Sequence, residues 1–188
     1  MIRAVILSAA VALTPLVVSN PAPAQTAHAP QPYAALKART VKALSDQQIA
    51  DLRAGRGMSL ALPAELNGYP GPAHALENAD ALAMSPAQRE RTKALFEAMK
   101  AEAVPLGERL IREETELDRL FATKAVQPAS LEAATHAIGT TQGALRAAHL
   151  RYHLAMMDVL TPEQVRRYAE VRGYGQARER HGHGAHTP

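Results

Sequence analysis

Two histidines four residues apart, His149 and His153, are the strongest candidates for chemistry in this chain of 188 residues. In a helix this spacing puts both imidazoles on one side, about 6 Å apart along the axis, where they can bind one metal ion. Met157, one turn further on, and Glu113, on an earlier helical stretch, are further candidate ligands. The candidate metals are zinc, nickel, cobalt and copper, because neutral imidazole is a common ligand for such ions. The alternative is that His149, near the centre of an apolar stripe, is a core residue hydrogen-bonded to a neighbour.

A second group of histidines, His181, His183 and His186, lies in a C-terminal stretch without a core pattern. We expect residues 175–188 to form a mobile tail that either collects divalent metal weakly or only solubilises the chain. Glu102 and Glu113 flank the apolar stripe of a long helix, where pairing with arginine is the alternative to metal binding.

Catalysis finds little support in the sequence. The segment from His149 to His153 has the histidine spacing of a zincin metalloprotease but lacks the Glu that serves as its general base. The chain has no Cys, which excludes disulfides, thiolate metal sites and cysteine nucleophiles. It also lacks a phosphate-binding glycine loop and a nucleophile elbow. We therefore predict a protein that is not an enzyme and requires no cofactor.

The charge of the chain argues against nucleic acid as a partner. Its 21 Lys and Arg against 18 Asp and Glu give a formal net charge of +3, which is too balanced for a dedicated nucleic-acid binder. Arginines beside apolar positions suit weak contact with unfolded chains, although most are expected to be solvated. The candidates for such client contacts are Arg109, Arg112, Arg146 and Arg151.

The first 24 residues have the features of a cleavable export signal. Arg3 gives a positive start, an uncharged run follows from Ala4 to Val18, and Ala22 and Ala24 are small residues before the expected cleavage point. The apolar run is shorter than a bilayer requires, so we expect no stable membrane insertion. The predicted location is the periplasm.

Apolar periodicity predicts an all-α protein built on a long antiparallel helical hairpin. We expect one helix over about 86–124, kinked near Glu102 because Pro105 and Gly107 lie inside it, and a second over 128–159. A final helix starts at Pro162, and shorter elements precede the hairpin. Residues 25–72 are expected to hold an N-terminal arm, a short helix and a Gly/Pro-rich loop that packs on the helical domain of 73–174. The spacing of Gly139 and Gly143 suggests close helix approach or a bend.

Three helix starts share one pattern, in which Ser or Thr is followed by Gln three residues later. Each is a capping box, because the hydroxyl accepts from the Gln backbone while the Gln side chain reaches back. An apolar residue stands in front. The first copy runs over 44–48, and the other two are carried by Met84, Ser85 and Gln88 and by Leu160, Thr161 and Gln164.

The copy from Leu160 to Gln164 matches the LTxxQ motif, and with its upstream variant at Met84 the chain resembles periplasmic Spy/CpxP-like and heavy-metal-resistance (CnrX-like) proteins over about 73–174. The resemblance implies a small helical hairpin that forms a cradle-shaped homodimer. Some such proteins are ATP-independent chaperones or stress-signalling modulators, and others are metal sensors. His153 and Met157 have the spacing of the sensor's His-x-x-x-Met pair, but the additional His-x-x-x-His of the sensor's first helix is missing.

These features lead to one hypothesis and one alternative. The hypothesis is a periplasmic, stress-protective protein of Spy/CpxP type that binds unfolded periplasmic proteins or a membrane signalling protein without ATP. The alternative is a periplasmic heavy-metal-binding or sensing protein that uses His149 and His153.

Overall fold

The structure, a computed structural model, describes residues 33–175. The named secondary-structure elements in that range are all helices. The predicted export signal and the histidines at 181, 183 and 186 lie outside these residues. The chain divides into two units at Ala34, and the account below concerns the second, which begins at Ala35. The all-α prediction is confirmed. The elements are the 3₁₀-helix η1 (Ala34–Ala38) and the helices α1 (Asp46–Arg53), α2 (Leu62–Glu65), α3 (Pro72–Glu77), α4 (Pro86–Ala122), α5 (Pro128–Met156) and α6 (Pro162–Val171).

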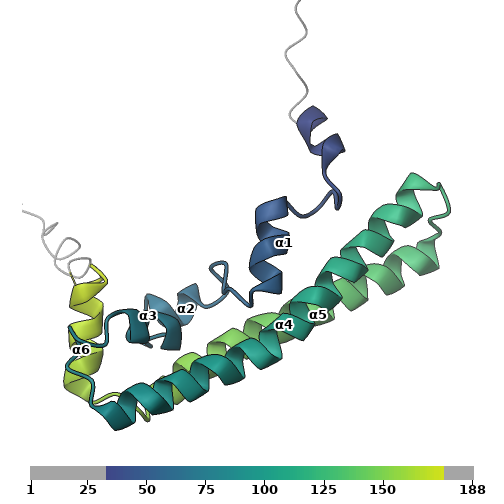
Figure 1. Ribbon diagram of the computed structural model, residues 1–188. Coiled ribbons are helices and arrows are strands. Elements are labelled where there is room, and N and C mark those ends of the chain that lie inside the picture. Colours follow the sequence, from purple (N-terminus) through teal and green to yellow (C-terminus); the bar gives the residue numbers. More distant parts are fainter. Residues whose placement is uncertain (1–32, 176–188) are drawn as a thin grey trace, which may run out of the picture. The chain divides into compact units, whose positions relative to one another are not determined.

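The two long helices α4 and α5 lie side by side as an antiparallel hairpin (Figure 1). Both were predicted from apolar spacing, and their bounds differ from the prediction by three residues or fewer. Pro105 lies inside α4, which continues through it as one element, so the expected kink does not interrupt the helix. The facing stripes bury large apolar side chains along most of the hairpin, whereas Phe121 and Leu131 at its turn are exposed.

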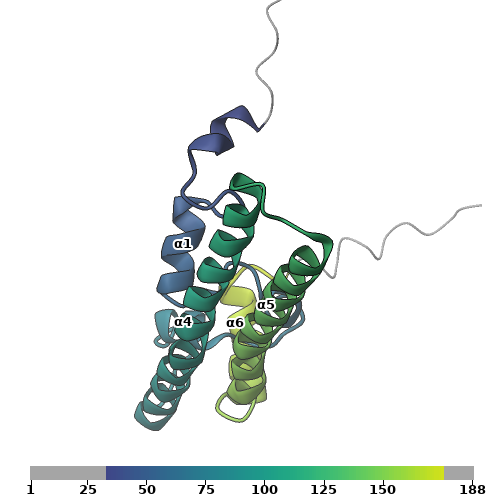
Figure 2. The same ribbon diagram turned by 90° about the vertical axis from the view of Figure 1, so that its right-hand side faces the viewer.

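The close approach predicted at Gly139 and Gly143 is wrong. A Cβ at either glycine would meet nothing within 4 Å. The tight contact is instead at Gly107 of α4, where a Cβ would lie 2.6 Å from the carbonyl oxygen of Leu52 at the end of α1. The helix that approaches Gly107 is α1, which comes from the segment before the hairpin and packs against α4 (Figure 2).

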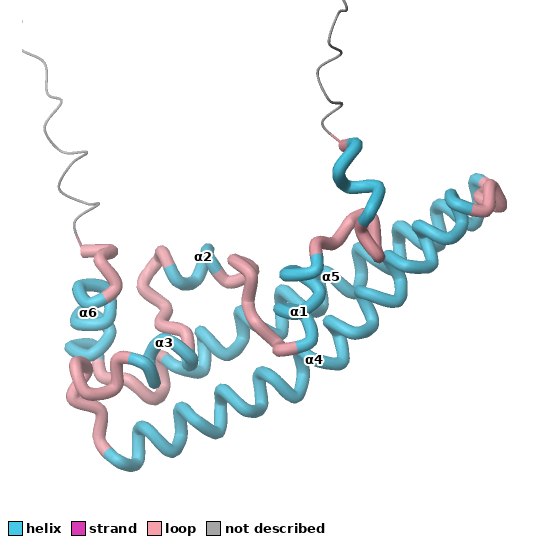
Figure 3. The backbone as a smooth tube through the Cα atoms, turned by 45° about the horizontal axis from the view of Figure 1, so that its top comes forward, coloured by secondary structure: helices cyan, strands magenta, loops and turns pink. Residues whose placement is uncertain are grey.

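The segment that joins α1 to α3 runs along the hairpin, as Figure 3 shows. Met58 and Leu60 are half-buried against the core, which confirms that this Gly/Pro-rich stretch packs on the helical body. Leu62 and Leu66, however, are exposed. Helix α2 contacts α5, and α3 contacts both long helices. The segment of residues 41–72 therefore forms one wall of the same helical body.

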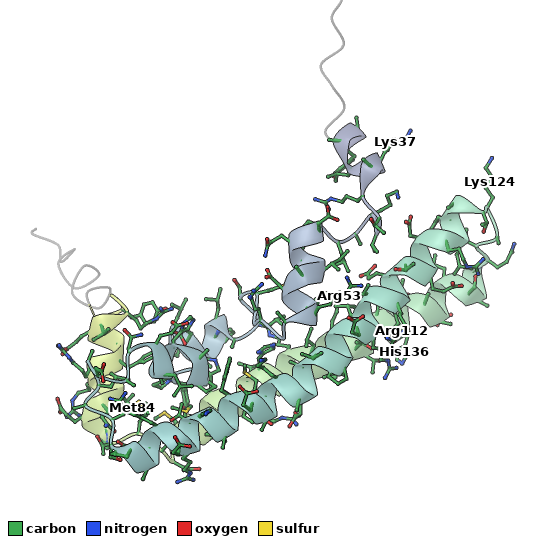
Figure 4. All side chains as sticks on the ribbon, in the orientation of Figure 1. Lys37, Arg53, Met84, Arg112, Lys124 and His136 are labelled. Carbon is green, nitrogen blue, oxygen red and sulfur yellow. The ribbon has the colours of Figure 1, made fainter. Side chains whose placement is uncertain are left out.

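Two hydrophobic clusters hold this arrangement together. The first joins α1 to the middle of the hairpin through Leu52, Leu110 and Leu145. The second lies at the end of the hairpin, where Leu82, Met156 and Tyr168 join α3, α5 and α6. The three predicted capping boxes are confirmed at the starts of α1, α4 and α6. Figure 4 labels Met84 at the α6 end, with Arg112 and His136 further along the hairpin.

Candidate functional site

A pocket of about 530 Å³ opens between the hairpin and the segment that precedes it. Helix α5 contributes His149 and His153 to its lining, and α4 contributes Phe96 and Met99. The opposite wall comes from the loop after α1, from α2 and from the start of α3, and Arg172 and Tyr174 complete it. The pocket is where the two histidines predicted from their spacing come together.

His149 is 2% exposed, and its Nε2 atom has no hydrogen-bond partner among the described residues. Burial lowers the pKa of His149 below its ordinary value, and the nearby His153 lowers it further. The imidazole is therefore neutral at physiological pH, and a neutral imidazole is the form that binds metal ions. The expected core role, with a hydrogen bond to a neighbour, is met only in part, because the burial is observed and no bond to Nε2 is present.

His153 is held by the backbone of the loop after α2. Its Nδ1 atom lies 2.7 Å from the carbonyl oxygen of Tyr69. Because a carbonyl only accepts, Nδ1 carries the hydrogen of this bond, which leaves Nε2 as the nitrogen of His153 on the other side of the ring. A hydrogen bond from the far nitrogen to a backbone carbonyl is how proteins usually orient a metal-binding histidine.

Gly71 forms the floor beneath the His153 ring. A Cβ at this position would lie 2.8 Å from Cε1 of His153 and 3.0 Å from Nε2. Atoms do not approach so closely, so a larger residue at 71 would displace the ring. Gly57, which faces His149, is less tight, since a Cβ there would lie 3.6 Å from Nδ1.

Glu65, from α2, is a buried carboxylate next to His153. Its Oε1 atom accepts hydrogen bonds from the hydroxyl of Tyr168, at 2.5 Å, and of Tyr174, at 3.2 Å. Arg172 pairs with the same oxygen at 3.3 Å. The Oε2 atom has no hydrogen-bond partner among the described residues and lies 3.8 Å from Nδ1 of His153. Burial raises the pKa of Tyr168, and the hydrogen bond to Glu65 raises it further, so the phenol remains a donor.

The structure separates the other predicted ligands from this pocket. Glu113 accepts a hydrogen bond from Arg109 at 2.8 Å, and Met157 is partly exposed at the end of α5. Neither lines the pocket. Glu102 accepts from Arg151 and from Tyr152, so both carboxylates at the edge of the stripe are paired with arginine, as expected.

The predicted client-binding arginines are all at the surface. Arg109 and Arg151 form the ion pairs just described, and Arg112 and Arg146 are exposed. The motif residues at 84, 85, 88, 160, 161 and 164 gather at the end of the hairpin near α6, where they cap helices and pack in the second cluster.

Sequence reasoning did not identify Glu65, Tyr168 or Arg172 as parts of the site. Glu65 follows Leu62, Pro63 and Ala64 in a stretch that has no helical period, so nothing in the sequence marked it as buried. Its burial depends on α6 returning over α2, a contact between residues 103 positions apart.

The donor atoms of the pocket fit a transition metal ion in their chemistry. Two histidines and a glutamate line one cavity, and one atom on each of His149 and Glu65 is buried without a partner among the described residues. Within residues 33–175, however, no three His, Asp or Glu side chains are arranged to hold a metal ion together. The two imidazoles are therefore the prepared ligands, and Glu65 is a neighbouring carboxylate engaged mainly with α6.

Comparison with known proteins places these residues in one matched region. A family model described as heavy-metal resistance matches residues 57–167, which include His149, His153 and Glu65. No curated protein and no solved structure shows a significant match to the chain. Among the helices of residues 33–175, none combines the length and the apolar character that crossing a membrane requires.

Proposed function

Because the chain belongs to the heavy-metal-resistance family, we propose that it is an exported protein that binds one transition-metal ion in the pocket of His149 and His153. The residues that would hold the ion are these two histidines, through Nε2. The ion is cargo or signal here, and no bond-making chemistry is proposed.

The observation that carries this proposal is that His149 and His153 line one pocket and that Nε2 of His149 is buried without a partner among the described residues. Leaving a buried polar atom without a partner costs about 1–3 kcal/mol. A bound ion would offset that cost. The neighbouring His153 ring is already oriented through its hydrogen bond to the Tyr69 carbonyl.

Titration calorimetry with zinc, nickel, cobalt and copper ions tests the proposal. The protein should carry His181→Ala, His183→Ala and His186→Ala and no affinity tag, so that heat from other histidines does not obscure the site. We expect one ion per chain, with affinity lowered about tenfold or more by His149→Ala or His153→Ala. His136→Ala, on an exposed residue of the same helix, is the matched control and should leave the metal affinity and the number of ions bound unchanged. Absence of heat with all four metals, or equal effects of all three variants, would overturn the proposal.

A second candidate function, client binding of the Spy/CpxP type, is favoured by apolar side chains at the surface. Leu66, after α2, is 58% exposed, and Leu154, on α5, is 60% exposed. Leu62 and Met157 are exposed beside them in the sequence. Exposed apolar patches mark interaction sites for unfolded chains, for a membrane signalling protein or for a second copy in a homodimer.

Suppression of aggregation of a chemically unfolded protein, without ATP or metal, tests this second function. A client-binding protein should retain its protection after His149→Ala and His153→Ala, and should lose it after Leu66→Ser with Leu154→Ser. Protection that needs metal, or that survives loss of both leucines, would argue against it. Sedimentation of the same variants would report whether these side chains also support a homodimer.

A further inference from the structure

Two methionines border the pocket that holds His149 and His153. Met99 lies on α4 and is 6% exposed, and Met58 lies in the loop after α1. Methionine is common in cores as an adaptable apolar side chain, and Met58 does pack against the first hydrophobic cluster. Both are nevertheless among the residues that line the cavity with His149 and His153.

The backbone at Met58 is in a conformation that methionine rarely adopts. Its φ angle is 39°, and that of the next residue, Ser59, is 69°. Residues held in the left-handed region cost about 1–3 kcal/mol each and concentrate at functional sites. Glycine would take this conformation without strain, and the same loop uses glycine at 55 and 57. Met58 therefore holds a strained backbone position while it lines the pocket.

The number of hard ligands in the pocket is too small for most divalent ions. Structural zinc sites take four ligands, and magnesium-like octahedral sites take six. The described residues offer no three His, Asp or Glu side chains in one group. Thioether sulfur is a soft ligand that selects copper(I), an ion that needs few ligands and also accepts imidazole.

The charge of the pocket also favours an ion of low charge. The carboxylate next to His153 is that of Glu65, and it is already paired with Arg172. A divalent ion bound by the two histidines would find its nearest carboxylate, that of Glu65, already compensated by an arginine. Because the cost of burying an ion rises steeply with its charge, a monovalent ion is the better match.

We propose that the ion this pocket selects is copper(I), held by the imidazoles of His149 and His153 and by the thioether of Met58, Met99 or both. The inference rests on the metal binding proposed above and adds the identity of the ion and its sulfur ligands. No redox step is involved, since the ion is bound in the reduced form in which it is supplied.

The test is a competition titration without oxygen, on the protein whose tail histidines are replaced by alanine. A coloured copper(I) chelator reports copper(I) affinity, and a zinc chelator reports zinc affinity in parallel. We expect Met58→Leu with Met99→Leu to lower copper(I) affinity about tenfold or more while zinc affinity stays unchanged. Met157→Leu, at an exposed methionine outside the pocket, is the matched control and should leave both affinities as they were.

The outcomes separate the copper(I) inference from the more general proposal of metal binding. If zinc binds through the histidines but the methionine variants leave copper(I) affinity unchanged, the copper(I) inference is overturned and metal binding stands. If neither ion binds, both fail. X-ray absorption at the copper edge of the protein with both methionines intact gives a readout that does not depend on variant folding. We expect nitrogen and sulfur around the copper, and a shell of nitrogen and oxygen alone would overturn the inference.

Discussion

The side-chain amides of Gln88 and Gln164 hydrogen-bond each other in both directions, at 2.7 Å and 3.0 Å. Each is the last residue of one copy of the repeated helix-start pattern. Each oxygen also caps its own helix by accepting from the backbone of Ser85 or Thr161. The amide nitrogens donate further to the carbonyls of Val159 and Leu82. The pair thus ties the start of α4 to the start of α6.

Replacement of either glutamine should lower the free energy of unfolding by more than the loss of a helix cap alone would. We expect Gln88→Ala and Gln164→Ala each to lower the free energy of unfolding by about 1–3 kcal/mol, because buried partners are left without their bonds. The double variant should cost less than the sum of the two, and urea unfolding of all four proteins measures this coupling.

Gln48→Ala is the matched control for this prediction. Gln48 forms the same capping box with Ser45 at α1 but has no second glutamine as a partner. Its loss should cost about 1 kcal/mol or less. Additive effects of the Gln88 and Gln164 changes would contradict the coupling.

The sequence predicted the caps but not their pairing. A capping box depends on residues three apart, so it can be recognised locally. The contact between the two glutamines joins residues 76 positions apart, and it exists only once the hairpin has returned to its starting end. The same reason explains why the helices were predicted within a few residues while the position of α1 on α4 was not.

Replacing glycine by alanine should have opposite effects on the stability of the protein at two positions of the hairpin. Gly107→Ala places a methyl group against the Leu52 carbonyl and should destabilise the protein by about 1–3 kcal/mol. Gly143→Ala adds a methyl group in open space within a helix and should stabilise it by up to about 1 kcal/mol. Thermal unfolding of the two variants is the measurement. Stabilisation by both would show that α1 does not hold its place on α4.

Two glycines of the pocket wall, Gly71 and Gly57, should differ in their effect on metal binding. Gly71→Ala should displace the His153 ring and weaken metal binding about tenfold or more, because supporting residues fix the orientation of a ligand. Gly57→Ala makes only ordinary contact with His149 and should leave the affinity close to that of the unchanged protein. Calorimetric titration of both variants compares them. An equal loss at both positions would indicate a general disturbance of the pocket and not a specific support of His153.

A carboxylate far from the pocket should control the pH dependence of stability. Burial raises the pKa of Glu114, and the charge of Glu113 raises it further. The folded protein therefore binds this proton more tightly than the unfolded chain, so the stability from Glu114 is complete at low pH. It is lost as the pH rises from the ordinary pKa of a glutamate, about 4.3, through the raised value.

Glu114→Gln cannot ionise and should therefore raise the melting temperature at pH 7, with the difference vanishing near pH 4. The control is Glu116→Gln, since a hydrogen bond from Arg119 lowers the pKa of Glu116 and the change should not stabilise the protein. A Glu114→Gln variant that is no more stable than the unchanged protein at pH 7 would contradict the assignment.

Only the histidine side of the candidate site could be predicted from the sequence. His149 and His153 share a helix, so their spacing alone placed both imidazoles on one side. Glu65, Met58 and the floor at Gly71 come from a segment whose path follows from packing and not from periodicity. Glu113 was predicted as a ligand from its place beside the apolar stripe, but it lies further along α4 than the pocket and pairs there with Arg109.

The most direct test of metal binding is nuclear magnetic resonance of the histidine side-chain nitrogens during addition of one equivalent of zinc or copper(I), both of which are diamagnetic. The account predicts that the Nε2 signals of His149 and His153 shift together and stop changing at one ion per chain. The Nδ1 signal of His153 should keep its proton, because Tyr69 accepts it. Shifts confined to other histidines, with His149 and His153 unchanged, would contradict the account.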